Sequence, residues 1–249
     1  ITYALGGTDA ASFNLDSNSG VLTFKTSPDY ETDQRNYTIT VTSSDGANTS
    51  DQTITVSLVN LNDNDPVFTS GAESFFTADE NQTTIGELVA TDADGDDLAF
   101  SLTGTSDVEI DSATGVMTFV SAPDFETKSS YSFFATVTDS ERASVQEVNI
   151  TISDINEAPT ITSTTTAFSA VENQTAIPGA TITATDVDAD DVLTFSVSGD
   201  VLIINSETGV LSFAEAPDFE TTTEVTATVT VTDEAGLTDT EVVTVTVTN

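Results

Sequence analysis

An internal repeat is the sequence feature that most constrains the fold. A Gly-Val motif followed by an apolar, polar, apolar run begins at Gly20, Gly115 and Gly209, so its copies are 95 and 94 residues apart. A Pro-Asp-aromatic-Glu motif begins eight residues after each of these glycines. A repeat of this length predicts tandem copies of one domain.

Each copy has the pattern of a β-sandwich. Apolar and polar residues alternate in short runs, as at Phe133, Ala135 and Val137, which is typical of half-buried strands. In the second copy we expect strands near residues 74–78, 85–91, 98–103, 108–110, 116–119, 131–137 and 145–153. The sequence therefore predicts an all-β protein of tandem, seven-stranded Greek-key β-sandwiches, stacked head to tail into a rod.

The prolines at positions 66 and 159 end strand pairing and so mark the expected domain boundaries. We expect a partial repeat over residues 1–65 that lacks its first strands. Full repeats are expected over residues 66–158 and 159–249.

The charge restricts the chemistry. The 249 residues include 42 Asp plus Glu but only 4 Lys plus Arg, giving a net charge of −38, and there is no His or Cys. The usual donors for zinc, haem and iron–sulfur centres are therefore missing, as are Ser-His-Asp and Cys-His catalytic groups. Such negative charge disfavours nucleic acid as a partner. No apolar run is long enough to predict direct membrane insertion. Oxygen donors remain, and these suit calcium.

The acidic residues recur at the ends of the expected strands. If successive repeats stack, carboxylates from both sides of the second linker meet. This junction would gather Glu80, Asp124, Glu126, Asp154, Glu157, Asp186, Asp188 and Asp233, with Asn156 and backbone carbonyls such as that of Ile155 as neutral donors. Two like charges about 4 Å apart repel by about 4 kcal/mol at an effective dielectric near 20. Calcium, which takes 6–8 oxygens at about 2.3–2.6 Å, would relieve this repulsion.

These motifs and their spacing resemble tandem cadherin repeats of the bacterial kind over essentially the whole chain. The family's X-E-X, D-R-E, D-X-N-D-N-X-P and D-X-D motifs and its lone late Asp correspond to Asp79-Glu80-Asn81, Asp124-Phe125-Glu126, Asn60-Leu61-Asn62-Asp63-Asn64-Asp65-Pro66, Asp92-Ala93-Asp94 and Asp139. The resemblance implies calcium between repeats, where it stiffens the rod. At the first junction it implies the ligands Asp29, Glu31, Asn60, Asn62, Asp63, Asn64, Asp92, Asp94 and Asp139.

The chain departs from the family pattern at several positions. Phe125 replaces the Arg of D-R-E, Asn60 replaces the first linker Asp, and the second linker is shorter. The chain has no Trp, so an adhesive swap of an N-terminal Trp is not expected.

Other interpretations of the acidic motifs are weaker. Single acidic loops are commonly just solvated. Residues 92–97 resemble an EF-hand loop, but the Gly comes too early and no flanking helices are expected. Asp124 and Glu126 could be imagined as a glycosidase pair, but the pair recurs in every repeat, so we expect no enzyme.

The sequence thus favours an extracellular or cell-surface module. We expect a calcium-stiffened spacer or adhesin that supports calcium-dependent adhesion, with another cadherin-like chain as a candidate partner. The alternative is a calcium-dependent polysaccharide-binding module, although the chain has no Trp and only four Tyr.

The two junctions are expected to differ. The first offers six carboxylates and the second eight, so we expect tighter calcium binding at the second. At the C-terminal end, Glu172, Asp218 and Glu220 would form half a site that binds weakly or not at all.

Overall fold

The structure is a computed structural model that describes residues 1–189 and 191–249. Within these residues the one helix is a short 3₁₀ turn, η1 (Ala10–Ser12), and the regular structure is otherwise β. The chain divides into two compact units, which we describe separately. The first unit contains residues 1–78, 83–121 and 130–151, and the second contains residues 79–82, 122–129 and 152–249.

The strands of the N-terminal region pair only with one another among the described residues. They are β1 (Thr2–Gly6), β2 (Phe13–Leu15), β3 (Leu22–Phe24), β4 (Asn36–Ser44) and β5 (Thr49–Ser57). One sheet has the order β1-β4-β5, and β2 pairs with β3. Phe13, Tyr37 and Ile39 form a small buried core between them.

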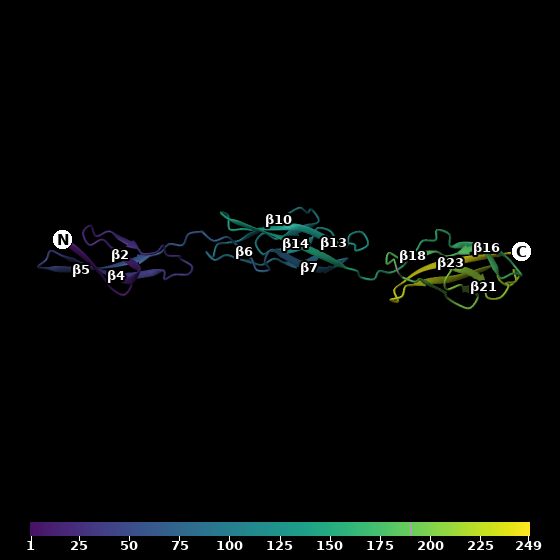
Figure 1. The fold of residues 1–249 in the computed structure, drawn as a ribbon. Helices are drawn as coiled ribbons and strands as arrows, with labels where there is room; N and C mark the ends of the chain where they lie inside the picture. The colour runs from purple at the N-terminus through teal and green to yellow at the C-terminus, as the bar shows by residue number, and fades with distance from the viewer. Residues whose placement is uncertain (190) are drawn as a thin grey trace. The chain divides into compact units, whose positions relative to one another are not determined.

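The middle group forms the two sheets of a sandwich, in the teal part of Figure 1. Its strands are β6 (Val67–Phe68), β7 (Glu73–Asp79), β8 (Thr84–Glu87), β9 (Ala90–Thr91), β10 (Ala99–Thr103), β11 (Val108–Ile110), β12 (Val116–Phe119), β13 (Ser130–Thr138) and β14 (Ala143–Ser153). One sheet has the order β10-β13-β14-β7, a second has the order β11-β12-β8, and β6 pairs with β9. Phe133, Ala135 and Val137 of β13 are at most 2% exposed, which confirms the predicted inward alternation.

The C-terminal group repeats this arrangement. Its strands are β15 (Thr160–Ile161), β16 (Ala167–Val171), β17 (Ala176–Thr181), β18 (Ala184–Thr185), β19 (Thr194–Val197), β20 (Leu202–Ile204), β21 (Val210–Phe213), β22 (Glu224–Thr232) and β23 (Thr238–Thr248). The sheets have the orders β16-β23-β22-β19 and β17-β21-β20, and β15 pairs with β18. Val229, Val243 and Val245 lie in a fully buried core.

The structure corrects one predicted strand. Residues 85–91 were expected as a single strand but form β8, which pairs with β12, and β9, which pairs with β6. The break occurs where the Leu88 N–H donates to the Gly115 carbonyl at 2.9 Å. Gly115 has φ +74°, and a Cβ there would lie 2.2 Å from the Leu88 oxygen, so the position requires glycine. A Cβ at Gly209 would likewise lie 2.0 Å from the Ile182 carbonyl oxygen. The recurring Gly-Val motif is therefore structural.

Candidate metal centres

Strand ends position the acidic residues. Glu80 directly follows β7, Asp139 follows β13, Asp154 follows β14 and Asp233 follows β22. The predicted residues of the first junction, here called the first acidic cluster, all lie in the first unit: Asp29, Glu31, Asn60, Asn62, Asp63, Asn64, Asp92, Asp94 and Asp139. Those of the second junction, the second acidic cluster, all lie in the second unit: Glu80, Asp124, Glu126, Asp154, Ile155, Asn156, Glu157, Asp186, Asp188 and Asp233.

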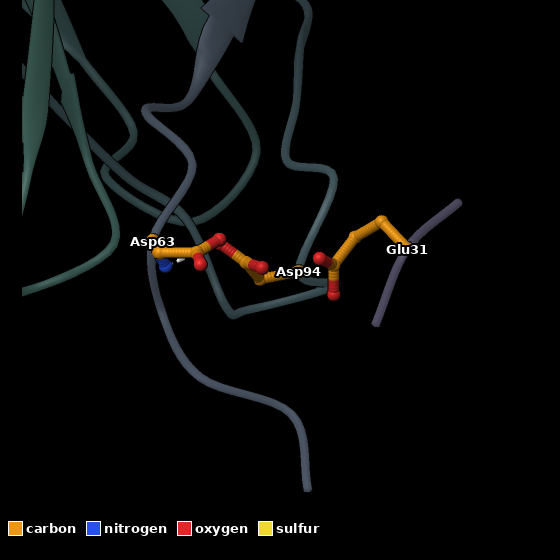
Figure 2. Close-up of side chains that lie close together, drawn as sticks. All are labelled: Glu31, Asp63 and Asp94. Atoms are coloured by element: carbon orange, nitrogen blue, oxygen red, sulfur yellow. Dashed lines mark hydrogen bonds between the residues drawn. The ribbon is translucent and has the colours of Figure 1, made fainter. Parts of the chain in front are cut away.

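Three carboxylates converge in the first acidic cluster. Glu31, Asp63 and Asp94 each offer an oxygen, and these oxygens all lie within 4.8 Å of one another. Figure 2 shows the three side chains coming from separate segments, with Asp94 between the other two. Burial, followed by the side-chain hydrogen bond with Asp29 and the charges of Asp94 and Asp29, raises the pKa of Glu31. The group therefore favours a cation or a proton at this position.

Asp94 also organises the first linker. Its Oδ2 accepts hydrogen bonds from the N–H groups of Asp63 at 3.1 Å and Asn64 at 2.8 Å. Its Oδ1 accepts one from Asn64 Nδ2 at 3.0 Å, and its carbonyl accepts one from Asn60 Nδ2 at 2.8 Å. Although burial opposes the effect, the hydrogen bonds from Asn64 and Asp63 lower the pKa of Asp94. Asp94 thus stays ionised and fixes the linker.

Asp139 is the most buried carboxylate of the first acidic cluster, at 5% exposure. Its Oδ1 accepts hydrogen bonds from the N–H groups of Glu141 and Arg142 at 2.8 and 2.7 Å. The bond from Arg142 is the main cause that lowers the pKa of Asp139. Its Oδ2 is buried and has no hydrogen-bond partner within the described part of the chain.

Glu80 is the most buried carboxylate of the second acidic cluster and binds backbone N–H groups of two separate segments. It is 3% exposed, its Oε2 accepts the Phe125 N–H at 2.9 Å, and its Oε1 accepts the Ile155 N–H at 3.0 Å. Oxygens of Glu80, Asp124 and Glu126 lie within 4.8 Å of one another. One buried carboxylate therefore joins the Pro-Asp-aromatic-Glu turn to the second linker.

The second linker also contacts residues of the third repeat. The Glu157 N–H donates to Asp188 Oδ2 at 2.9 Å, and Asn156 Nδ2 donates to Asp233 Oδ2 at 2.9 Å. Oxygens of Glu126, Glu157 and Asp188 form a further group within 4.8 Å. Burial, followed by the charges of Asp188 and Glu80, raises the pKa of Asp154. Burial is also the main cause that raises the pKa of Glu157.

Several predicted ligands also make hydrogen bonds that shape the local structure. Asp29 Oδ1 accepts the N–H groups of Glu31 and Thr32 at 2.9 and 3.3 Å, which caps the turn. Asp124 caps the equivalent turn through Thr127. The amides of Asn60 and Asn64 act as donors to Asp94. These four residues have local structural roles besides any role as ligands.

Two acidic residues were missed by the sequence analysis. Oxygens of Asp92, Asp94 and Asp96 lie within 4.8 Å of one another, and Asp191 Oδ2 is buried in the second unit. Both Asp96 and Asp191 closely follow an Asp-X-Asp motif. The run of aspartates over residues 92–97 could have indicated Asp96 as a ligand. It was excluded because the run does not fit an EF-hand loop.

Unpartnered oxygens identify where a cation would fit. Seven buried side-chain oxygens have no hydrogen-bond partner among the described residues: Glu31 Oε1, Asn62 Oδ1, Asp92 Oδ2, Asp139 Oδ2, Glu157 Oε2, Asp186 Oδ2 and Asp191 Oδ2. Six belong to predicted ligands, and the seventh is on the neighbouring Asp191. Buried polar atoms without partners are rare, and a bound ion is one explanation.

The spacing is compatible with calcium. Oxygens about 2.3–2.6 Å from one ion lie at most about 5.2 Å apart. Groups whose oxygens lie within 4.8 Å of one another satisfy this limit. The carboxylate-rich donor set points the same way.

The fold matches solved cadherin structures. Human CDH23 EC21-23 superposes with a TM-score of 0.70 at 21% identity, covering 98% of this chain and 88% of that one. Mouse Protocadherin-24 EC1-3 gives a TM-score of 0.63 at 23% identity, covering 100% of this chain and 90% of that one. This chain therefore has the fold of tandem cadherin repeats. Extracellular domains appear among the similar structures, such as those of Protocadherin Gamma B2.

Sequence comparisons point in the same direction. The chain is 38% identical over 172 residues to human Protocadherin Fat 4 and 33% identical over 169 residues to human Protocadherin-11 X-linked, each match covering 63% of this chain. It spans only 3% and 12% of those two proteins. A family model described as a bacterial Ig domain matches residues 156–246.

In the described residues, no helix has the length and hydropathy needed to cross a membrane.

Proposed function

We propose that the chain is a calcium-binding extracellular module in which ions bind at both acidic clusters and hold adjoining repeats together. The seven buried, unpartnered oxygens carry this proposal, because all seven lie in or beside the predicted ligand sets. A surface carboxylate exposed to water would need no such explanation. A bound cation would supply the partner that these buried oxygens lack.

The ligands link segments that are distant in sequence. In the first acidic cluster Glu31 comes from the first repeat, Asp63 from the first linker and Asp94 from the second repeat. In the second, Glu126 comes from the second repeat, Glu157 from the second linker and Asp188 from the third repeat. An ion coordinated by all three segments resists their separation, whereas the uncompensated carboxylates repel one another. Calcium therefore stiffens the array, which acts as a spacer or adhesin.

A calcium titration by calorimetry tests the binding. Wild type is expected to bind several ions, and Glu80→Gln and Glu31→Gln are each expected to lose part of the heat. Glu207→Gln is the matched control, since Glu207 lies on an exposed turn outside both clusters. The proposal fails if wild type shows no binding or if the control changes as much as the cluster variants.

Small-angle scattering tests the stiffening. The particle is expected to be longer and more uniform with calcium than after chelation. Identical scattering in both conditions would show that the ions do not hold the repeats together.

The proposed partner is another cadherin-like chain. One similar structure is described as a cis-dimer, that of Protocadherin gammaB7 EC3-6. Calcium also lowers the repulsion between two chains of net charge −38. Sedimentation is expected to show calcium-dependent self-association. Calcium-dependent retention on insoluble polysaccharide, with no self-association, would favour the carbohydrate-binding alternative.

A further inference from the structure

Arg142 places a fixed positive charge on the first acidic cluster. It is one of only 4 basic residues in the chain and lies in the turn between β13 and β14. Its Nη1 is 3.0 Å from Asp65 Oδ1, and its Nε donates to the Asn62 carbonyl at 3.4 Å. Its guanidinium therefore lies against the linker that supplies Asn62 and Asp63.

The second acidic cluster lacks both members of this ion pair. The Asp139 N–H donates to the Arg142 carbonyl, and the Asp233 N–H donates to that of Leu237, so Leu237 occupies the equivalent position. Asp65 precedes Pro66, whereas Ala158 precedes Pro159. The Arg142–Asp65 ion pair of the first acidic cluster is thus replaced by the uncharged Leu237 and Ala158 at the second.

Arg142 could affect the first acidic cluster by positioning the linker or through its positive charge, and these two effects can be distinguished. Asp94 already holds the linker through the N–H groups of Asp63 and Asn64 and through the Asn64 amide. The ion pair is solvent-exposed, with side-chain exposures of 41% for Arg142 and 61% for Asp65, and such pairs stabilise little. The remaining influence of the guanidinium is its charge. Asp63 and Asp139 both lie close enough to help raise the pKa of Arg142, after Asp65 itself.

We propose that Arg142 sets the calcium affinity of the first acidic cluster by supplying a built-in cation that competes electrostatically with the ion. The inference rests on the proposed calcium function. A positive charge near the ligands reduces the attraction that an arriving divalent ion experiences. Arg142 therefore weakens calcium binding and partly relieves carboxylate repulsion when calcium is scarce.

Reciprocal substitutions test the proposal. Arg142→Leu copies the third repeat, Arg142→Lys keeps the charge, and Leu237→Arg with Ala158→Asp moves the ion pair to the second acidic cluster. Calorimetric titrations use the full chain. An Asp188→Asn background weakens the second acidic cluster, so that the first can be followed when Arg142 is changed.

Arg142→Leu is expected to tighten calcium binding about three- to tenfold at low salt. The gain should shrink as salt rises, because salt screens exposed charge. Arg142→Lys should stay near wild type, and the transplanted pair should weaken the second acidic cluster. Hydrogen exchange of residues 60–65 in calcium-free buffer should be the same in wild type and Arg142→Leu, since Asp94 holds the linker.

Each other result has a defined meaning. Unchanged or weaker binding in Arg142→Leu, while wild type binds calcium, overturns this inference and leaves the proposed function intact. Faster exchange of residues 60–65 in Arg142→Leu would show that Arg142 positions the linker, and it also overturns the charge argument. Absence of calcium binding by wild type overturns both proposals.

Discussion

The two acidic clusters use the same strand ends but neutralise their charge differently. In the first, amides of Asn60 and Asn64 donate to Asp94, and the Arg142 guanidinium pairs with Asp65. In the second, Asn156 donates to Asp233, and Leu237 replaces the arginine. The first cluster thus carries part of its compensation within the chain, whereas the second depends more on an external cation.

The pKa directions agree with this difference for the linker carboxylates, although, against the effect of burial, a hydrogen bond from Asn156 lowers the pKa of Asp233 in the second cluster and burial raises that of Asp96 beside the first. Burial raises the pKa values of Asp154, Glu157 and Asp191 in the second unit. In the first acidic cluster, burial raises that of Glu31, while hydrogen bonds from Asn64 and Asp63 lower that of Asp94 against the effect of burial. One architecture can therefore be made more or less cation-dependent by a few linker residues.

Calcium removal is expected to have the largest effect. An ion that binds only the folded state stabilises it by about 4 kcal/mol at a thousandfold excess over its dissociation constant. Calorimetry should show a lower Tm in EDTA. Hydrogen exchange should show that residues 154–158 lose more protection than residues 60–65, since hydrogen bonds from Asp63 and Asn64 to Asp94 hold the first linker without calcium. Equal losses of hydrogen-exchange protection at the two linkers would contradict the proposal that the second acidic cluster depends more on calcium.

Glu80→Ala is expected to have the next largest effect. The change removes the carboxylate that accepts the part-buried Phe125 and Ile155 N–H groups, and hydrogen bonds to charged groups contribute about 1.5–3 kcal/mol each. Stability should therefore fall even without calcium, and calcium binding at the second acidic cluster should weaken as well.

Glu172→Ala provides the matched control for Glu80→Ala. Glu172 makes the equivalent hydrogen bond, accepting the Phe219 N–H at 3.1 Å, but lies outside the second acidic cluster. It should lower stability and leave calcium binding at both clusters unchanged. A calcium stoichiometry unaffected by Glu80→Ala would contradict the ligand assignment.

The fold was largely predictable because its signals are local. Alternation in residues 131–137 predicted β13, and the turn motifs predicted the strand ends. The break between β8 and β9 was not predictable in this way. It depends on contact between Leu88 and Gly115, which are 27 residues apart, and no local pattern records that contact.

The candidate site was only partly predictable. Repetition identified the acidic residues, because strand ends place them together. Their partners could not be read from the sequence: Asp29 and Asp124 also cap turns, and Asp94 accepts hydrogen bonds across the linker. The ion pair of Arg142 with Asp65 spans 77 residues and has no counterpart in the other repeats that could have revealed it as a motif.

A calcium titration is expected to resolve two affinity classes. The predicted carboxylates number six in the first cluster and eight in the second, and adding Asp96 and Asp191 makes seven and nine. More ligand charge favours tighter binding. The tight class should disappear in Asp188→Asn and the weak class in Asp94→Asn, which changes the equivalent position. A single affinity, or a tighter first cluster, would show that carboxylate number does not decide the order.

The smallest expected effect is a pH dependence of opposite sign with and without calcium. A carboxyl whose pKa is raised by folding lowers stability at neutral pH, and this cost disappears as the pH falls through the folded pKa. Glu157 and Asp154 are such groups. Carboxyls with lowered pKa values, such as Asp94 and Asp139, lose their stabilising contribution only near and below the unfolded value of 3.8. At pH values above the unfolded values of 3.8 and 4.5 the raised groups therefore dominate.

Calcium-free protein should consequently show a higher Tm at pH 5 than at pH 7, and calcium-loaded protein a lower one, because protons then compete with the ion for the same oxygens. The calcium-free gain should be concentrated in residues 154–158 by hydrogen exchange, since Asp154 and Glu157 lie in the second linker. Glu157→Gln should reduce the gain, while Glu207→Gln on its exposed turn should not. A flat or falling Tm in calcium-free buffer would mean that the carboxylates of the second acidic cluster separate in solution rather than remaining crowded. The cluster would then require calcium to assemble, not merely to stay neutral.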